Sequence, residues 1–346
     1  MTPSPIQELA SVAARAASAD NSQPYRLHWN GRQLALHYAV RHPEYNVFGP
    51  ASHATLLSAG GVIEYLQQTL EASGVAPQWQ WGSGGQPYAS LDLPDLPAKL
   101  NIPPALLQRH TNRAPFKRAG LPADVLQQLG AMREGAQQIY LVQQPAERKR
   151  LIQQMRLCAE ARFCTRELHE WLQGSLRRTP AEVAQGDGLD VACLALPPGG
   201  RQMLDFIAPW PRMARLNALG AYKLLALSEL GPLNNAPVLL CLAGPDGVRE
   251  GLDAGRLLAR AWSWLNAQGI AVHPYYVVTD QVSRLQAGSV AQGFAAQVGQ
   301  AAAAVGDLLQ LPQGARLHMI LRLGYPSREV PRSRRLPAEQ LLTVDA

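Results

Sequence analysis

The chain has 346 residues, 47% of them hydrophobic, which is enough to bury one large core or two closely packed ones. Its formal net charge is +6, but the basic residues are dispersed and are not interleaved with aromatic ones, so we expect no nucleic-acid partner. No run approaches the roughly 18 apolar residues that span a bilayer, and the N-terminus has no secretory signal pattern, so we expect a cytoplasmic protein without a membrane partner. The four cysteines lack C-x-x-C spacing and nearby histidines, which predicts neither a metal site nor a disulfide framework.

The first hundred residues predict a helix, a strand pair and a second helix. The expected elements are a helix over 6–19, strands over 25–30 and 33–40, and a helix over 53–73. The first helix must end at an Asn-Ser-Gln-Pro turn, because Pro24 disfavours helical backbone at Gln23. Asn30-Gly31 suits the turn of a hairpin, and Gly74 suits the end of the second helix.

A proline-rich stretch over 91–104 is typical of a linker, and it divides the chain into halves at 1–100 and 101–346. The later elements are expected to be a helix over 123–132, a strand over 138–142, a helix over 146–171, a strand over 237–243, a helix over 251–268, and strands over 269–276 and 318–325. Residues 172–235 are interrupted by Pro and Gly and predict irregular structure with short helices that lie over the site as a lid-like insertion.

Two short motifs, one in each half, carry the chemistry. Arg109-His110-Thr111-Asn112-Arg113 offers two cations and a hydroxyl at alternate positions, a pattern that suits a phosphate at the start of a helix. About ninety residues upstream, Asn21-Ser22-Gln23-Pro24 forms a polar turn before a strand. Each has an ordinary structural reading, as solvated helix residues for the arginines and as an Asx-type turn for the amides.

Two later segments add to this pattern. A glycine-led strand ends in His273-Pro274-Tyr275-Tyr276, and a final strand leads to Ser333-Arg334-Arg335. The last two arginines could make charge-assisted bonds to a phosphate, or they could belong to an exposed tail. His273 is better explained as a structural histidine at a strand end than as a proton donor.

Taken together, these four segments resemble the FMN-dependent nitroreductase superfamily, and most closely its internally duplicated members, in which one chain corresponds to a fused dimer. The resemblance implies an α+β fold with a mixed, mainly antiparallel sheet and two pseudo-equivalent halves. It implies one FMN site in the chain, and a protein that is either a monomer with pseudo-dimer architecture or a homodimer.

The resemblance also implies roles for individual residues. Arg109 and Thr111 would anchor the phosphate and ribityl chain, and Arg113 would lie near flavin N1 and C2=O. Asn21, Ser22 and Gln23 would border the ring. The remaining expected positions are Pro274, the backbone amide of Tyr276 or Val277 near flavin N5, and the phosphate ligands Arg334 and Arg335.

The chemistry expected from the resemblance is a ping-pong transfer of hydride between NAD(P)H or an organic substrate and an electron-poor acceptor, with flavin N5 as the reacting atom and no catalytic side chain. Two alternatives stay open. One is a biosynthetic flavoprotein that runs in the oxidative direction or uses oxygen. The other is a non-catalytic protein that sequesters flavin beneath the lid of residues 172–235.

Overall fold

The computed structural model describes residues 3–83 and 86–345. In the first half the elements are α1 (Pro5–Ala13), β1 (Tyr25–Trp29), β2 (Gln33–Tyr38), α2 (His53–Ala72), β3 (Trp79–Trp81) and β4 (Ala89–Asp92). The hairpin of β1 and β2 around Asn30-Gly31 and the long helix α2 are as predicted. Helix α1 ends earlier than expected, at Ala13, and a short 3-10 turn (Ala19–Asn21) precedes the Asn-Ser-Gln-Pro turn.

The second half repeats this order of elements with two insertions. The repeated elements are α4 (Ala123–Ala131), β6 (Gln137–Val142), β9 (Val238–Pro245), α11 (Val248–Ala267), β10 (Ala271–Tyr275) and β11 (Ala315–Gly324). The first insertion, between β6 and β9, holds α5 (Pro145–Phe163), α6 (Arg166–Ser175), α7 (Pro180–Ala184), α8 (Gly200–Ile207), α9 (Trp210–Ala218) and α10 (Ala221–Leu230). The second, between β10 and β11, holds α12 (Val277–Gln286) and α13 (Ala295–Leu309).

In the described part of the chain, ten strands form two five-stranded sheets of matching order, and β7 (Leu176–Arg177) and β8 (Leu189–Asp190) pair in parallel as a separate two-stranded sheet. One runs β12-β1-β2-β4-β3 and the other β5-β6-β9-β11-β10, and within each the three pairings among the four repeated strands are antiparallel. The outermost strands differ: β5 (Arg133–Glu134) continues antiparallel beside β6, whereas β12 (Leu342–Val344) lies parallel to β1. The α+β fold with mainly antiparallel sheets and two pseudo-equivalent halves is therefore confirmed, with its strands shared between two sheets.

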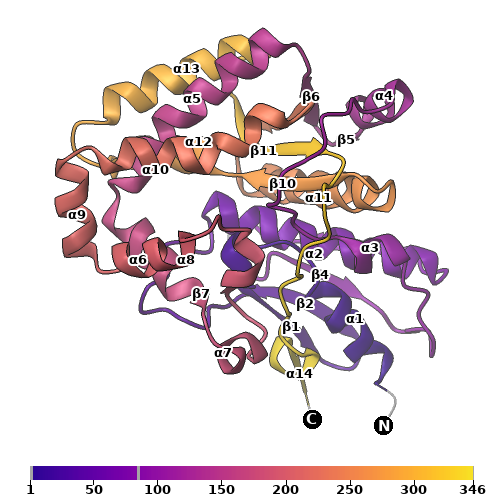
Figure 1. The fold of residues 1–346 in the computed structure, drawn as a ribbon. Coiled ribbons are helices and arrows are strands. Elements are labelled where there is room, and N and C mark those ends of the chain that lie inside the picture. The colour runs from indigo at the N-terminus through magenta and orange to yellow at the C-terminus, as the bar shows by residue number, and fades with distance from the viewer. Residues whose placement is uncertain (1–2, 84–85, 346) are drawn as a thin grey trace.

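The two long helices α2 and α11 pack against each other between the sheets (Figure 1). Their backbones touch, because a Cβ built on Gly60 would lie 2.0 Å from the carbonyl oxygen of Leu252, and one on Gly255 would lie 2.3 Å from that of Leu57. Each half has its own apolar core on its side of this helix pair. A third core lies between the second sheet and the inserted helices α5, α10, α12 and α13.

Two expectations about helices were wrong. The predicted helix over 146–171 is two helices, since α5 ends at Phe163 and α6 begins at Arg166 after a break at Cys164-Thr165. The arginine motif does not open a helix: Arg109 follows α3 (Pro104–Gln108), and the chain stays non-helical until α4. Pro115 and Pro122 disfavour a helix there, and the Asn112 side chain accepts a bond from the Ala114 backbone N–H that closes a local turn.

The chain returns to the first half after β11. Its last segment crosses between the halves, passes α14 (Ala338–Leu341), and adds β12 beside β1 (Figure 1). β12 thus falls within the range 101–346 predicted for the second half, but it pairs in the sheet of the first half. None of the helices in the described part of the chain combines the length and apolar character of a membrane span.

Candidate functional site

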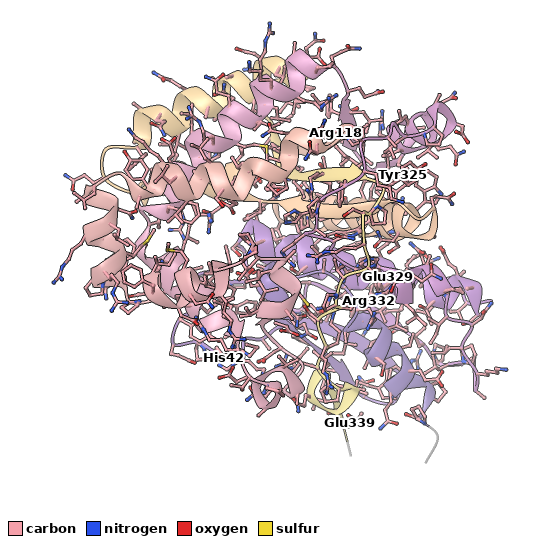
Figure 2. The ribbon with its side chains drawn as sticks, in the orientation of Figure 1. His42, Arg118, Tyr325, Glu329, Arg332 and Glu339 are labelled. Atoms are coloured by element: carbon pink, nitrogen blue, oxygen red, sulfur yellow. The ribbon has the colours of Figure 1, made fainter. Side chains whose placement is uncertain are left out.

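Four arginines from three distant segments gather where the returning segment passes between the halves. Arg15 follows α1, Arg109 follows α3, and Arg332 and Arg335 lie on the returning segment; Figure 2 labels Arg332 there, between Glu329 and Glu339. Arg109 is only 3% exposed, and its Nη2 and Nε donate to the carbonyl oxygen of Arg15 at 2.9 and 3.3 Å. Its guanidinium also lies 4.9 Å from the ring centre of Trp262. We call these four residues the arginine cluster.

The cations of this cluster lower one another's pKa. Burial lowers the pKa of Arg335 to about 9, and the charges of Arg109 and Arg15 add to this effect. The pKa of Arg15 is lowered first by burial, then by Arg109 and Arg332. Like charges brought together away from water raise the free energy of the folded state unless an opposite charge joins them.

No carboxylate balances the arginine cluster among residues 3–83 and 86–345, where none of its members forms an ion pair. Some other arginines of this chain have carboxylate partners, whereas the fully buried Arg322 donates only to backbone carbonyl oxygens of the described residues. Arg177 lies 3.0 Å from Asp187, and the Nε of Arg260 lies 2.7 Å from Glu64. The cluster therefore has the donor set of an anion site, and several guanidinium groups converging from separate segments are well suited to a phosphate.

The Asn-Ser-Gln-Pro turn lies directly beside the cluster. Its backbone is left-handed at Asn21 (φ 60°) and Gln23 (φ 48°), which costs free energy and points to a constrained position. The side-chain amide of Asn21 donates to the carbonyl oxygens of Gly188 at 2.9 Å and of Arg334 at 3.0 Å, and its oxygen accepts from Arg335. The turn and the returning segment are thus fixed to each other.

Gln23 extends this contact to the first insertion. Its Nε2 donates to the carbonyl oxygen of Gly186 at 3.0 Å, and its Oε1 accepts from the backbone N–H of Leu336 at 3.1 Å. Ser22 faces elsewhere, in the wall of a small separate cavity with Tyr45 and Trp171. Gly186, which belongs to the segment 172–235 expected to form a lid, therefore packs on the turn.

Arg113 is half-buried and lies near Asp20, Cys193 and Tyr275. Its Nη1 donates to the carbonyl oxygen of Cys193 at 3.4 Å, and burial lowers the pKa of its guanidinium while the charge of Asp20 raises it. Asp20 accepts a bond from Trp171 Nε1 at 2.9 Å, and burial raises the pKa of its carboxyl. Arg113 and Asp20 thus form a half-buried pair of opposite charges without a direct salt bridge.

The end of β10 lies against this region. The backbone N–H of Asn112 donates to the carbonyl oxygen of Val272 at 2.9 Å, so the arginine motif runs beside β10. Burial, Arg113 and Arg322 lower the pKa of His273 well below its ordinary value. Within the described ranges, His273 Nδ1 and the Tyr275 hydroxyl have no hydrogen-bond partner. Buried polar atoms without partners are uncommon and indicate a ligand or water position.

The structure brings together Arg109, Arg335, Asn21 and Gln23, and it places Arg113 and Pro274 beside them on the arginine motif and β10. Thr111 is half-buried on the same motif, and the Arg334 side chain is exposed while its carbonyl oxygen binds Asn21. Tyr276 lies apart from the cluster, at the start of α12, and its side chain lines a different pocket.

Sequence reasoning missed Arg15, Asp20 and Trp171. Arg15 gives little local signal, because an arginine just after the C-terminus of a helix such as α1 is an ordinary, favourable placement. Trp171 has none, because it comes from α6, about 150 residues away from Asp20. Among the described residues no group of three or more His, Cys, Asp or Glu could hold a metal ion.

No protein-family model matches the chain, and no curated protein sequence matches it. Solved structures that match part of the chain include a nitroreductase with bound FMN from Bacteroides fragilis, at 13% identity over 70% of this chain and 97% of that chain, with a TM-score of 0.36. The FMN-dependent nitroreductase NfnB from Mycobacterium smegmatis, in complex with NADPH, matches at 17% identity over 66% and 91%, with a TM-score of 0.37. A variant of the FMN- and NADPH-dependent nitroreductase NfnB from sphigopyxis sp. strain HMH matches at 19% identity over 69% and 96%, with a TM-score of 0.38. The cofactors named here belong to those proteins.

Proposed function

We propose that this protein is an FMN-dependent oxidoreductase with one cofactor site per chain, built from both halves. The observation that carries the proposal is the arginine cluster, in which converging, partly buried cations have no carboxylate partner in the described ranges. An FMN phosphate carries close to two negative charges at neutral pH, and it would balance this cluster. The nitroreductase-like motifs lie at the same place, which favours flavin over other phosphate ligands.

Different residues would hold different parts of FMN. Arg15, Arg109 and Arg335 would bind the phosphate, with Thr111 toward the ribityl chain. Arg113 would place a cation near the pyrimidine edge of the ring, where negative charge develops on reduction, and His273 and Tyr275 hold free polar atoms nearby. Bound FMN would supply hydride and electron transfer at its N5 atom, and no side chain is required as a nucleophile.

We further propose that the chain is a fused dimer. Its two halves share one order of elements and one order of strands, and α2 and α11 meet as equivalent helices. The cluster takes Arg15 from the first half, Arg109 from the start of the second and Arg335 from the returning segment, so a monomer would hold a complete site. NAD(P)H as the electron donor and a small electron-poor acceptor are part of the same proposal.

The experiment that tests the proposal is a titration of apoprotein with FMN and, separately, with riboflavin. Arg109→Ala should weaken FMN binding by about 2–4 kcal/mol, because it removes a charge-assisted phosphate contact. It should leave riboflavin binding unchanged, because riboflavin has no phosphate. Arg166→Ala is the control, since Arg166 is exposed on α6 and pairs with Glu170. Equal FMN affinity of the Arg109 variant and the parent would exclude this phosphate site.

One observation favours a second function, flavin sequestration. The insertion contacts the site directly, through Gly186 and Gly188 on the turn and Cys193 on Arg113. A segment held this way would cover a bound ring and keep NAD(P)H from reaching it. Anaerobic reduction of the FMN-loaded protein distinguishes the two functions: NADPH bleaches the flavin of a reductase, whereas only dithionite bleaches that of a sequestering protein.

A further inference from the structure

A second polar cavity of about 600 Å³ lies at the start of α12. We call it the α12 pocket. It is lined by the segment before α2, the turn between β9 and α11, helix α12 and Arg316 of β11. Tyr276 is its one residue from the set predicted for the cofactor. The volume falls within the range of small-molecule sites, about 300–1,000 Å³.

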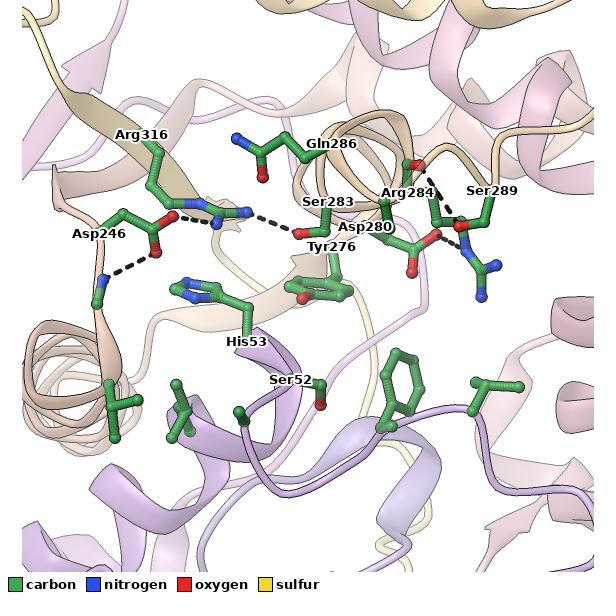
Figure 3. A pocket seen from close by; sticks show the side chains of 17 residues that line it. Ser52, His53, Asp246, Tyr276, Asp280, Ser283, Arg284, Gln286, Ser289 and Arg316 are labelled. Carbon is green, nitrogen blue, oxygen red and sulfur yellow. Dashed lines mark hydrogen bonds and ion pairs between the residues drawn. The ribbon is translucent and has the colours of Figure 1, made fainter. Parts of the chain in front are cut away.

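One wall of the α12 pocket is apolar and aromatic. Val47, Phe48, Leu56 and Val248 line it, and the rings of Phe48 and Tyr276 stand edge to face with centres 6.5 Å apart. Figure 3 shows the His53 and Tyr276 rings between this wall and the charged one. Burial lowers the pKa of His53 to about 3, so its ring is neutral near pH 7 and adds no charge. This wall suits a flat aromatic body.

The opposite wall is charged, and its charges are unevenly satisfied. Arg316 is fully engaged at its terminal nitrogens, with Asp246 at 2.8 Å and the Ser283 hydroxyl at 2.7 Å. Arg284 is engaged only through Nε, which lies 3.2 Å from Asp280. Within the described ranges its two terminal nitrogens donate no hydrogen bond, and Figure 3 shows them turned away from Asp280.

The formal charges of the two arginines and the two aspartates that line the pocket cancel, but the hydrogen-bond donors of Arg284 are not all used in the described part of the chain. Both carboxylates, Asp246 and Asp280, are matched by an arginine, whereas the terminal nitrogens of Arg284 are left for a ligand. The N-termini of α2, α11 and α12 also line the pocket, and helix N-termini carry partial positive charge. A planar carboxylate is the group that a free guanidinium edge binds best.

We propose that the α12 pocket binds small aromatic carboxylates, with the carboxylate on Arg284 and the ring packed against the Phe48 and Tyr276 pair. The pocket is separate from the arginine cluster and shares none of its residues. Binding itself does not depend on FMN. That the bound compound is the electron acceptor of the enzyme rests on the proposed function, through the position predicted for the Tyr276 backbone.

The test uses calorimetry on the full chain with three probes: 4-nitrobenzoate, its uncharged analogue 4-nitrobenzamide, and acetate. The proposal expects 4-nitrobenzoate to bind at least tenfold more tightly than either of the others, because only it has both a ring and a charge. Arg284→Gln should weaken 4-nitrobenzoate binding tenfold or more and leave 4-nitrobenzamide unchanged. Equal affinities of the acid and the amide, or an unaffected Arg284 variant, would overturn the proposal, as would no binding of 4-nitrobenzoate.

Matched variants test whether the lost Arg284 contact itself, and no secondary effect of the substitution, lowers the affinity for 4-nitrobenzoate. Arg166→Gln removes an arginine of the same kind, paired with a glutamate four residues on, and should change nothing. Asp280→Asn combined with Arg284→Gln keeps the net charge and should still lose affinity; full recovery in this double variant would mean that an unmasked Asp280, rather than a lost contact, caused the loss. Val248→Trp, on the apolar wall, should block binding without touching α12, so a poorly folded Arg284 variant leaves the test intact.

A final variant keeps this inference apart from the proposed function. Arg109→Ala should leave 4-nitrobenzoate binding unchanged, because Arg109 belongs to the arginine cluster. A loss there would place the probe in the cluster and refute the pocket assignment. If instead FMN fails to bind the parent protein while 4-nitrobenzoate still needs Arg284, the proposed function fails and the pocket stands.

Discussion

The arginine cluster leads to a prediction in which stability and binding change in opposite directions. Arg335→Gln should make the protein without FMN more stable, because it removes a cation that is taken out of water and also lies near Arg109 and Arg15. The pKa of Arg335 is lowered to about 9, several units below that of a free arginine, and each unit corresponds to about 1.4 kcal/mol. Losing the bond to Asn21 costs about 1 kcal/mol, and solvent screens part of the repulsion, so we expect a net gain of about 2 kcal/mol.

Urea unfolding of the apoprotein measures this gain, and a titration with FMN measures the accompanying loss of affinity. Arg177→Gln is the matched control, since it removes an arginine that Asp187 does balance, and it should destabilise the protein by more than 1 kcal/mol. If Arg335→Gln lowers the stability of the apoprotein, the unpaired charge of Arg335 does not destabilise the folded state, and this prediction is wrong. If FMN affinity also stays the same, the phosphate assignment is refuted.

Three further predictions concern other parts of the chain. Lowering the pH from 7 to 5 should destabilise the fold, because burial lowers the pKa of His53 to about 3 and that of His318 to about 4. The stability that these neutral histidines contribute above about pH 6.5 is lost as the pH falls toward 4, and the loss is about 2 kcal/mol per histidine at pH 5. Urea unfolding of His318→Asn should show a free energy of unfolding that depends less steeply on pH. Gly60→Ala should cost more than about 3 kcal/mol, since its Cβ would lie 2.0 Å from a carbonyl oxygen of α11, whereas Gly306→Ala, in open space on α13, should be neutral or slightly stabilising in the same assay. Arg113→Ala should lower the midpoint potential of bound FMN with less effect on its affinity, and potentiometry that finds equal potentials would remove Arg113 from the ring.

Local patterns predicted the elements whose own residues determine them. The Asn30-Gly31 turn sets the hairpin, and the apolar spacing within 53–73 and 251–268 sets α2 and α11. The arginine motif was misread as a helix start, because its backbone is set by neighbours far away in the sequence, such as Val272. Periodicity also gives no sign of the break after Phe163.

The candidate site was predictable in its residue types and less so in its partners. Arg109, Arg335, Asn21 and Gln23 do meet, as motifs of one site should. Arg15 contributes its charge and its carbonyl oxygen to that site, and its role depends on a contact across 94 residues. Contacts of that range follow from the packing of whole elements, which a linear pattern does not contain.

The parallel pairing of β12 with β1 ties the first-formed part of the chain to one of its last. A ribosome releases residues 25–29 long before residues 342–344, so during synthesis β1 stays an open edge that can pair wrongly. The same returning segment brings Arg332 and Arg335 to the cluster on its way to that edge. Completing the first sheet at its edge and assembling the arginine cluster are therefore one late event, and, if the cluster is the proposed phosphate site, a chain that has not finished folding would not bind its ligand.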